Sequence, residues 1–267
     1  MPKGKRAFDR KQLQSAHKLK LQKWQQVGTS PWSRSRRKRA LDIALALTLL
    51  VGLAPAMLLI GIAVKLTSRG PVFFRQRRLG YGGVYFEILK FRTMVYDRAD
   101  VGPALTASGD SRLTLLGRVL RKWKLDEFPQ LFNVVRGEMS FVGPRPKLKH
   151  LELTGAGTLA VRPGITGMAT LAFRHEEALL AGLSRKQIEE FYVRTIAPLK
   201  VQLDLDYMRR ATFASDLLLM VQTVLSVIVP MPGLHFSNRE ELVPGAADAL
   251  VVANEKVWEG LAPTFES

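Results

Sequence analysis

Residues 43–64 read IALALTLLVGLAPAMLLIGIAV, a run of 22 residues without a charged side chain. As one helix this run is about 33 Å long, which is enough to cross the hydrocarbon core of a bilayer. The stretch in front of it is too long for a signal peptide, and the run itself is longer than a usual signal core. We therefore predict a helix that stays in the mature protein and lies in a membrane.

Basic residues flank this run in equal number. The N-terminal five are Arg34, Arg36, Arg37, Lys38 and Arg39, and the C-terminal five are Lys65, Arg69, Arg75, Arg77 and Arg78. Because positive charge stays on the cytosolic side, matched flanks favour a helix whose two ends face the same compartment. Pro55 has no N–H for the Val51 carbonyl and predicts a sharp bend. Two topologies fit, a re-entrant helix bent at Pro55 and a kinked spanning helix, and the flanks favour the first.

The composition describes a globular chain with a basic arm. The 267 residues are 47% apolar, enough for a core, and carry a formal charge of +17. Residues 1–40 contain thirteen of the 40 basic residues and one of the 23 acidic ones. Such an arm binds a polyanion, either anionic membrane lipids or nucleic acid. The absence of cysteine excludes a disulfide scaffold, a thiolate zinc site and a cysteine nucleophile.

Beyond residue 65, short strand and helix patterns alternate with polar loops. A β-hairpin is expected from 72–74 and 84–90 around Gly80, Gly82 and Gly83. Helices are expected at 114–124, through Leu131 to Gly137, and at 176–193, 198–210 and 217–229, the last as an interfacial or core helix. The fold class is therefore α+β, predominantly helical with a small β-hairpin. The expected domains are a basic arm (1–36), the membrane helix (37–66), a catalytic domain (67–230) and a mildly acidic tail of unassigned role (231–267).

The chemistry is expected from clusters of Arg, Lys and carboxylates. The four histidines, His17, His150, His175 and His235, have no metal-ligand spacing, and there is no P-loop or G-x-S-x-G motif. Cationic clusters lie at 70–80, 90–94 and 109–146. Guanidinium groups beside a carboxylate pair suit a phosphate-bearing substrate, and a diphosphate tends to bring a divalent metal with oxygen ligands.

Asp126 and Glu127 form the carboxylate pair, between two expected helices. One interpretation is structural, because an Asp ahead of a helix is often its N-cap. The other is catalytic: cations of residues 118–124 would hold Asp126 ionised as a nucleophile, while Glu127 binds a metal. These cations are Arg118, Arg121, Lys122 and Lys124. Arg145 lies between Pro144 and Pro146, which stiffen its backbone.

Residues 38–225 resemble the bacterial sugar transferase family, the polyprenyl-phosphate hexose-1-phosphate transferases, also called small monotopic phosphoglycosyl transferases. The matching motifs, in family order, are Lys38-Arg39 with Asp42, the helix containing Pro55, GPVFFRQ, KFRTM, DSRLT, LDEFPQLFNVVRGEMSFVGPRP, RPGITG, and LDLDYM followed by Asp216. The string covers about 70% of the chain. The chain departs from the pattern at Ala54, where many members have Ser, and after Gly167, where MATLAFRHEE lacks the usual Trp and Gln. Sugar preference is therefore not transferred.

The resemblance implies a monotopic membrane protein with a Pro-broken re-entrant helix and interfacial amphipathic helices, acting on the cytosolic face of the bacterial inner membrane. It implies transfer of a sugar 1-phosphate from a nucleotide sugar, with UDP the expected nucleotide, to polyprenyl phosphate, releasing UMP. The resemblance also implies that this reaction is the first membrane step of exopolysaccharide, O-antigen or glycoconjugate synthesis.

By the same resemblance, Asp126 forms a phosphosugar-aspartyl intermediate and Glu127 binds Mg²⁺. The residues expected to bind phosphate or to lie near the site are Lys90, Arg121, Arg145 and Asp204, with Arg92 and Arg112 as further candidates. Anionic lipids are expected partners, nucleic acid is not, and the oligomeric state stays open, a homodimer included. Two alternatives from other classes remain: a membrane-tethered nucleic-acid binder that uses the arm, and a scaffold protein.

Overall fold

The computed structural model describes residues 28–95, 110–148, 160–229, 236, 238–242 and 246. Residues 1–27 of the predicted arm, most of the predicted tail, and His17, His150 and His235 lie outside these residues.

The α-helices are α2 (Arg36–Thr67), α3 (Leu115–Lys122), α4 (Gln130–Arg136), α5 (Met168–Ala172), α6 (Glu176–Leu179), α7 (Arg185–Phe191), α8 (Ala197–Arg210) and α9 (Phe213–Ile228). The short helices are η1 (Trp32–Arg34), η2 (Leu125–Glu127), η5 (Arg239–Glu241) and the π-helix η4 (Tyr192–Ile196). The strands are β1 (Phe73–Leu79), β2 (Tyr85–Phe91), β3 (Ser140–Val142), β4 (Lys147–Leu148) and β5 (Gly164–Thr166).

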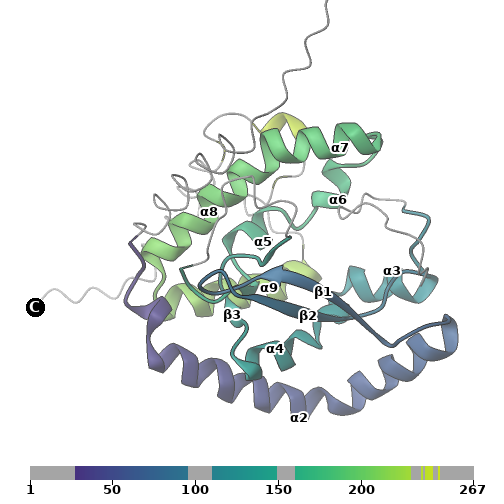
Figure 1. The fold of residues 1–267 in the computed structure, drawn as a ribbon, viewed down its shortest axis with the longest axis horizontal. Coiled ribbons are helices and arrows are strands. Elements are labelled where there is room, and N and C mark those ends of the chain that lie inside the picture. The colour runs from purple at the N-terminus through teal and green to yellow at the C-terminus, as the bar shows by residue number, and fades with distance from the viewer. Residues whose placement is uncertain are drawn as a thin grey trace, which may run out of the picture.

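Helix α2 is the one described helix long and apolar enough to cross a membrane. Ser35 caps its start, where the side chain accepts a hydrogen bond from the Lys38 backbone N–H at 3.0 Å. Figure 1 shows α2 as a curved rod that passes beneath the β1–β2 hairpin and α4. Pro55 lies inside α2, which continues as one curved helix to Thr67, and the sharp bend predicted at this residue stays a prediction. Pro55 removes one backbone hydrogen bond from this helix, and a proline inside a long helix favours a bend at its position.

Both ends of α2 are attached to the same body of the protein. Near the N-terminal end, Lys38 Nζ donates to Asp216 Oδ2 of α9 at 2.5 Å. At the C-terminal end, the Arg92 guanidinium, from the residue after β2, donates to the carbonyls of Ser68 at 2.7 Å and Val64 at 3.3 Å. The helix is therefore fixed at its two ends by contacts with one domain.

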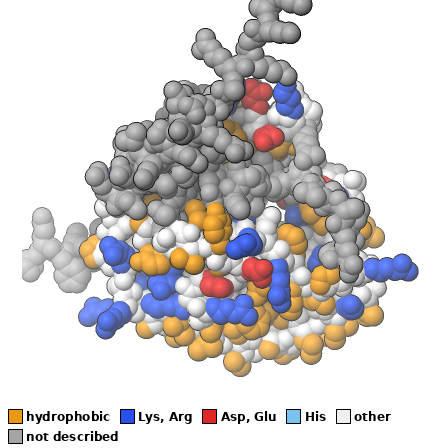
Figure 2. All heavy atoms as spheres, viewed as in Figure 1, with side chains coloured by type: hydrophobic (Ala, Val, Ile, Leu, Met, Phe, Trp, Pro, Cys, Tyr) orange, Lys and Arg blue, Asp and Glu red, His pale blue; other side chains and the backbone are white. Residues whose placement is uncertain are grey.

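Three of the described helices each expose two or more large apolar side chains. On α2 they include Leu41, Leu45, Leu47, Val51, Leu58, Leu59, Ile62 and Leu66; on α3, Leu115 and Val119; and on α9, Phe213, Leu217, Val221, Val224, Leu225 and Ile228. Figure 2 shows hydrophobic side chains gathered along the edge of the molecule where α2 lies. The residues of α9 recur at spacings of three and four, as in an amphipathic helix, and its opposite face packs in the core. The helix predicted at 217–229 is thus confirmed, and its amphipathic pattern is that of an interfacial helix.

The β-hairpin supports the site. Strands β1 and β2 pair antiparallel from Phe73 opposite Phe91 to Leu79 opposite Tyr85, and β4 adds to the free edge of β1. Gly82 and Gly83, with φ of +64° and +80°, form the turn that these two residues predict. Strands β3 and β5 form a separate parallel pair.

The predicted helices are confirmed with one difference. Helices α3, α4 and α8 match the expected segments, and Gly137, with a φ of +87°, ends α4 as predicted. The segment 176–193 is not one helix. It divides into α6 and α7 around Gly182, whose φ of +73° is incompatible with a helix.

Candidate active site

A sharp backbone turn positions Asp126 and Glu127. Lys124 adopts a φ of +56°, the only positive φ among the described non-glycine residues, and the chain then enters the single 3₁₀ turn of η2. The two carboxylates are 5% and 9% exposed. The helix-cap interpretation is wrong, because α4 begins after Pro129 with no side-chain cap hydrogen bond. A strained residue before a buried carboxylate pair is typical of functional sites.

Two cations neutralise Glu127. Lys90, near the end of β2, donates to Oε1 at 2.7 Å, and Arg145 Nη2 donates to the same atom at 3.1 Å. Burial alone would raise the pKa of Glu127, but Lys90 and Arg145 outweigh it and hold that pKa well below its ordinary value. Glu127 in turn raises the pKa of Arg145. Glu127 is therefore ionised at neutral pH.

The pKa of Asp126 is shifted in the opposite direction, upward. Its Oδ1 is buried and has no hydrogen-bond partner among the described residues. Burial raises the pKa of Asp126, the charge on Glu127 raises it further, and Lys90 is the strongest opposing influence. The neighbouring cations Lys90, Lys124 and Arg121 lower the pKa of Asp126, as expected, but burial outweighs them and the net shift is upward. Adjacent carboxylates with opposite pKa shifts are typical of groups with different roles in one site.

Arg121 lies on the last turn of α3, beside this pair. Its Nε donates to Thr93 Oγ1 at 3.1 Å, and its Nη1 donates to Glu177 Oε1 of α6 at 2.8 Å. Its charge also lowers the pKa of Asp126. Lys90, Arg121 and Arg145 are thus brought together around the two carboxylates.

The other predicted residues have different surroundings. The Arg92 guanidinium binds the C-terminal end of α2 and the Pro71 carbonyl, and Arg112 forms a two-pronged pair with Asp110 at 2.9 and 2.6 Å. Asp204 lies on α8 and is 5% exposed. Phosphate binding by Arg92 and Arg112, and a role for Asp204, stay predictions.

Residues of α6 and α8 that the sequence analysis did not select join the site. Lys200 donates to Glu176 Oε2 at 2.6 Å and lies 5.3 Å from the ring centres of Phe173 and Tyr192. Glu176 Oε1 is buried without a partner among the described residues, and its charge raises the pKa of Arg145. The pair Glu176-Glu177 was visible in the sequence, but no local pattern indicated that α6 folds onto α3.

The carboxylate pair fits a magnesium ion. Mg²⁺ binds through one or two protein carboxylates and completes its octahedral coordination with water and substrate phosphate. Glu127 and the unpartnered Oδ1 of Asp126 supply such oxygens. Among the described residues there is no group of three or more His, Cys, Asp or Glu that could hold a metal ion. Magnesium binding by Glu127 stays a prediction.

A second buried charged cluster, which we call the Asp216 cluster, consists of Lys38, Asp216, Tyr207 and Trp32. Lys38 and Trp32 Nε1 donate to Asp216 Oδ2 at 2.5 and 2.9 Å, and the Tyr207 hydroxyl donates to Oδ1 at 2.8 Å. Burial, and then Asp216, raise the pKa of Tyr207 well above its ordinary value. Both oxygens of Asp216 are bonded, so the cluster joins α2, α8 and α9.

The fold and the site define a protein with an exposed apolar helix and a buried Asp–Glu pair among cations, an arrangement suited to phosphate chemistry at a membrane. The family model of the bacterial sugar transferases matches residues 33–230. The chain belongs to the bacterial sugar transferase family, as its motifs predict.

Several characterised proteins are similar to this chain. The undecaprenyl-phosphate glucose phosphotransferase of Komagataeibacter xylinus is 39% identical over 202 residues, 70% of this chain and 35% of that protein. The UDP-glucose:undecaprenyl-phosphate glucose-1-phosphate transferase of Caulobacter vibrioides is 39% identical over 201 residues, 72% of this chain and 70% of that protein. The Escherichia coli protein of the same name is 36% identical over 200 residues, 72% of this chain and 40% of that protein. The chain thus spans 35% to 70% of the length of these relatives.

Proposed function

We propose that this chain transfers a sugar 1-phosphate from a UDP-sugar to polyprenyl phosphate and releases UMP, as an early membrane step of polysaccharide synthesis. The observation that carries the proposal is the contrast within the carboxylate pair. Asp126 has a buried oxygen without a partner, whereas Glu127 is fixed by Lys90 and Arg145. The names of the relatives support the donor and acceptor classes.

The reaction proceeds in two displacements at one phosphorus atom. A carboxylate oxygen of Asp126 forms a bond to the phosphorus of the sugar phosphate, the anhydride P–O bond breaks, and its electron pair leaves on UMP. An oxygen of polyprenyl phosphate then attacks the same phosphorus, and the P–O bond to Asp126 breaks. The second step restores the carboxylate and gives the polyprenyl-diphosphate-linked sugar. Both nucleophiles are anions, so neither step needs a proton to be removed.

The cations stabilise the charge that these displacements spread over phosphoryl oxygens. Lys90 and Arg145 point at Glu127 from β2 and from the Pro144–Pro146 segment, and Arg121 approaches from α3. Such positioned charges supply most of the catalysis in phosphoryl transfer. Mg²⁺ held by Glu127, when bound, withdraws further charge from the phosphate oxygens.

The attachment of α2 supports a re-entrant topology. A spanning helix would carry its second end to the opposite side of the membrane, but both ends of α2 contact the same domain. The apolar side chains between the ends are exposed, as they would be in lipid. We propose that α2 enters and leaves the inner membrane on the cytosolic face, where the soluble donor is available.

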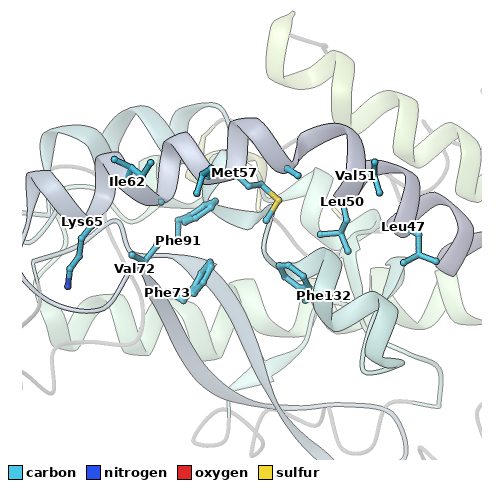
Figure 3. Close-up of a pocket in the computed structure, with 13 residues that line it drawn as sticks. Leu47, Leu50, Val51, Met57, Ile62, Lys65, Val72, Phe73, Phe91 and Phe132 are labelled. Carbon is cyan, nitrogen blue, oxygen red and sulfur yellow. The ribbon is translucent and has the colours of Figure 1, made fainter.

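An apolar groove beside α2 gives the lipid acceptor a place near the site. Its volume is about 810 Å³, and its walls come from α2, β1, β2 and α4. In Figure 3, Met57 of α2 lies close to Phe91, and Phe73 and Phe132 lie across the groove from α2. Phe91 packs in the same core cluster as Leu125 and Phe128, the residues that flank the carboxylate pair. The groove therefore lies beside the segment 125–128, which carries Asp126.

The activity is tested by UMP release from a panel of UDP-sugars in the presence of membrane-embedded polyprenyl phosphate. We expect release with at least one donor, and release that depends on polyprenyl phosphate at multiple turnovers. No release with any donor of the panel, from a protein that is folded and membrane-bound, would contradict the proposal.

The topology is tested separately with single cysteines, since the chain has none. Cysteines at Gln22, which lies outside the described residues, and at Tyr85, which is 36% exposed, are treated with an impermeant thiol reagent. We expect both to label only from the cytosolic side. If only one labels from that side, α2 spans the membrane; Pro55→Leu, which removes the proline, should move the protein toward that result.

A further inference from the structure

Arg78 lies beside the active site, at the end of β1. Its Nη1 donates to the carbonyl of Pro146 at 3.2 Å, immediately after Arg145, and its Nη2 donates to Gln76 Oε1 at 2.6 Å. The backbone pairing of Arg78 with Leu148 across β1 and β4 holds the two segments together. Arg78 and Arg145 are therefore neighbours in the fold, although 67 positions separate them in the sequence.

The guanidinium of Arg78 is incompletely bonded. Its Nε–H is buried and has no acceptor among the described residues. Burial, followed by repulsion from Arg145, lowers the pKa of Arg78 to about 10. A guanidinium only donates hydrogen bonds, so the group that completes it must be an acceptor, and the repulsion favours an anion.

Positive charges exceed negative ones around Glu127. Arg78, Lys90, Lys124 and Arg145 carry four positive charges, whereas Asp126 and Glu127 carry at most two negative ones. Arg121 and Lys200 do not change this balance, because their charges are paired with Glu177 and Glu176. The cluster is therefore complementary to an anionic ligand in contact with Arg145.

We propose that Arg78 is a substrate-binding residue that grips the diphosphate of the nucleotide sugar together with Arg145. The planar guanidinium presents Nε–H and an Nη–H as a fork that matches two phosphate oxygens. This inference rests on the proposed function for the identity of the donor. The competing explanation is that Arg78 only ties β1 to the Pro146 carbonyl.

The test compares binding of UDP, which carries the diphosphate, with binding of uridine, which does not. Arg78→Gln keeps an N–H donor for the Pro146 carbonyl and removes the charge. We expect it to weaken UDP binding by about 10- to 100-fold, the range for a hydrogen bond to a charged group, and to leave uridine binding unchanged. Arg77→Met is the matched control, because Arg77 precedes Arg78 on the strand, points to the other face and lies over the exposed ring of Tyr85.

A structural role would give a different result. If Arg78→Gln weakens UDP and uridine equally, or changes neither, the inference is overturned. If that variant does not fold, Arg78→Lys is measured instead; it keeps the charge but loses the fork, and UDP binding equal to that of the wild type overturns the bidentate contact. Since binding is measured without turnover, this result is separate from the UMP-release assay that decides the proposed function.

Discussion

The Asp216 cluster and the Asp126–Glu127 site are both buried and charged, but they are completed in different ways. In the Asp216 cluster, each carboxylate oxygen accepts hydrogen bonds from protein groups. In the active site, Asp126 Oδ1 has no partner among the described residues, and cations are in excess around Glu127. A completed polar network fixes structure, whereas an incomplete one is maintained for a ligand. The difference separates Asp216, whose hydrogen bonds hold α2 in place, from Asp126, the aspartate that we propose as the nucleophile.

The largest effect is expected from Asp126→Asn. This change removes the nucleophile, so UMP release should fall by about 10⁴-fold or more. The unfolding temperature should stay the same or rise, because a carboxylate that is costly to bury is replaced by a neutral group. Glu190→Gln, in an exposed pair with Arg194, is the control that loses a carboxylate without touching the site. Activity within tenfold of the wild type would show that Asp126 only supports structure.

Asp216→Asn is expected to reduce stability rather than to remove the nucleophile. It leaves Lys38 buried without its counter-ion and should lower the free energy of unfolding by about 3–5 kcal/mol. Adding Lys38→Met to Asp216→Asn should recover much of this loss, which a double-mutant cycle of thermal unfolding measures. An Asp216→Asn protein of undiminished stability but without activity would place Asp216 in the chemistry instead.

The pH dependence follows from the raised pKa of Asp126. In the proposed mechanism the ionised carboxylate attacks, so the acid limb of kcat/KM should lie above the ordinary aspartate pKa of about 3.9. Lys90 lowers the pKa of Asp126, so Lys90→Met should raise it and move the acid limb to higher pH, besides lowering the rate. A limb that stays in place in Lys90→Met would mean that another group titrates.

The smallest effect is expected from Arg112→Met. Arg112 pairs with Asp110 two residues away, and the side chains are 23% and 12% exposed. Because the partners of this pair are neighbours in the chain, its loss should leave UMP release within about threefold of the wild type. A loss of tenfold or more, as expected for Arg145→Met, would establish Arg112 as a phosphate-binding residue.

Much of the fold was predictable because local signals are strong where they occur. The glycines at 80–83, the helical spacing from Leu115 and the C-cap at Gly137 specify the hairpin, α3 and α4 directly. The division between α6 and α7 depends on one glycine inside an otherwise helical pattern, which is a weak signal. The attachment of both ends of α2 depends on contacts with Asp216 and Arg92, which join segments separated in the sequence and have no local signal.

The sequence predicted which residues gather at the candidate site better than it predicted the direction of the pKa shift of Asp126. Sequence proximity placed cations near Asp126, but the strongest one, Lys90, lies 36 positions away and reaches it through β2. Burial, which decides the direction of the pKa shift, is a property of the folded chain. Arg78 and Glu176 were not selected for the same reason, since their positions depend on contacts with segments far along the sequence.

The central claim is that Asp126 becomes covalently linked to the phosphosugar. The measurement is the intact-protein mass after the wild type and Asp126→Asn are incubated with each donor of the UDP-sugar panel and no polyprenyl phosphate, quenched within one turnover. The wild type should gain the mass of one sugar phosphate and release no more than one UMP per protein, and Asp126→Asn should gain nothing. Multiple-turnover transfer to polyprenyl phosphate without any adduct, or an adduct on Asp126→Asn, would contradict the account.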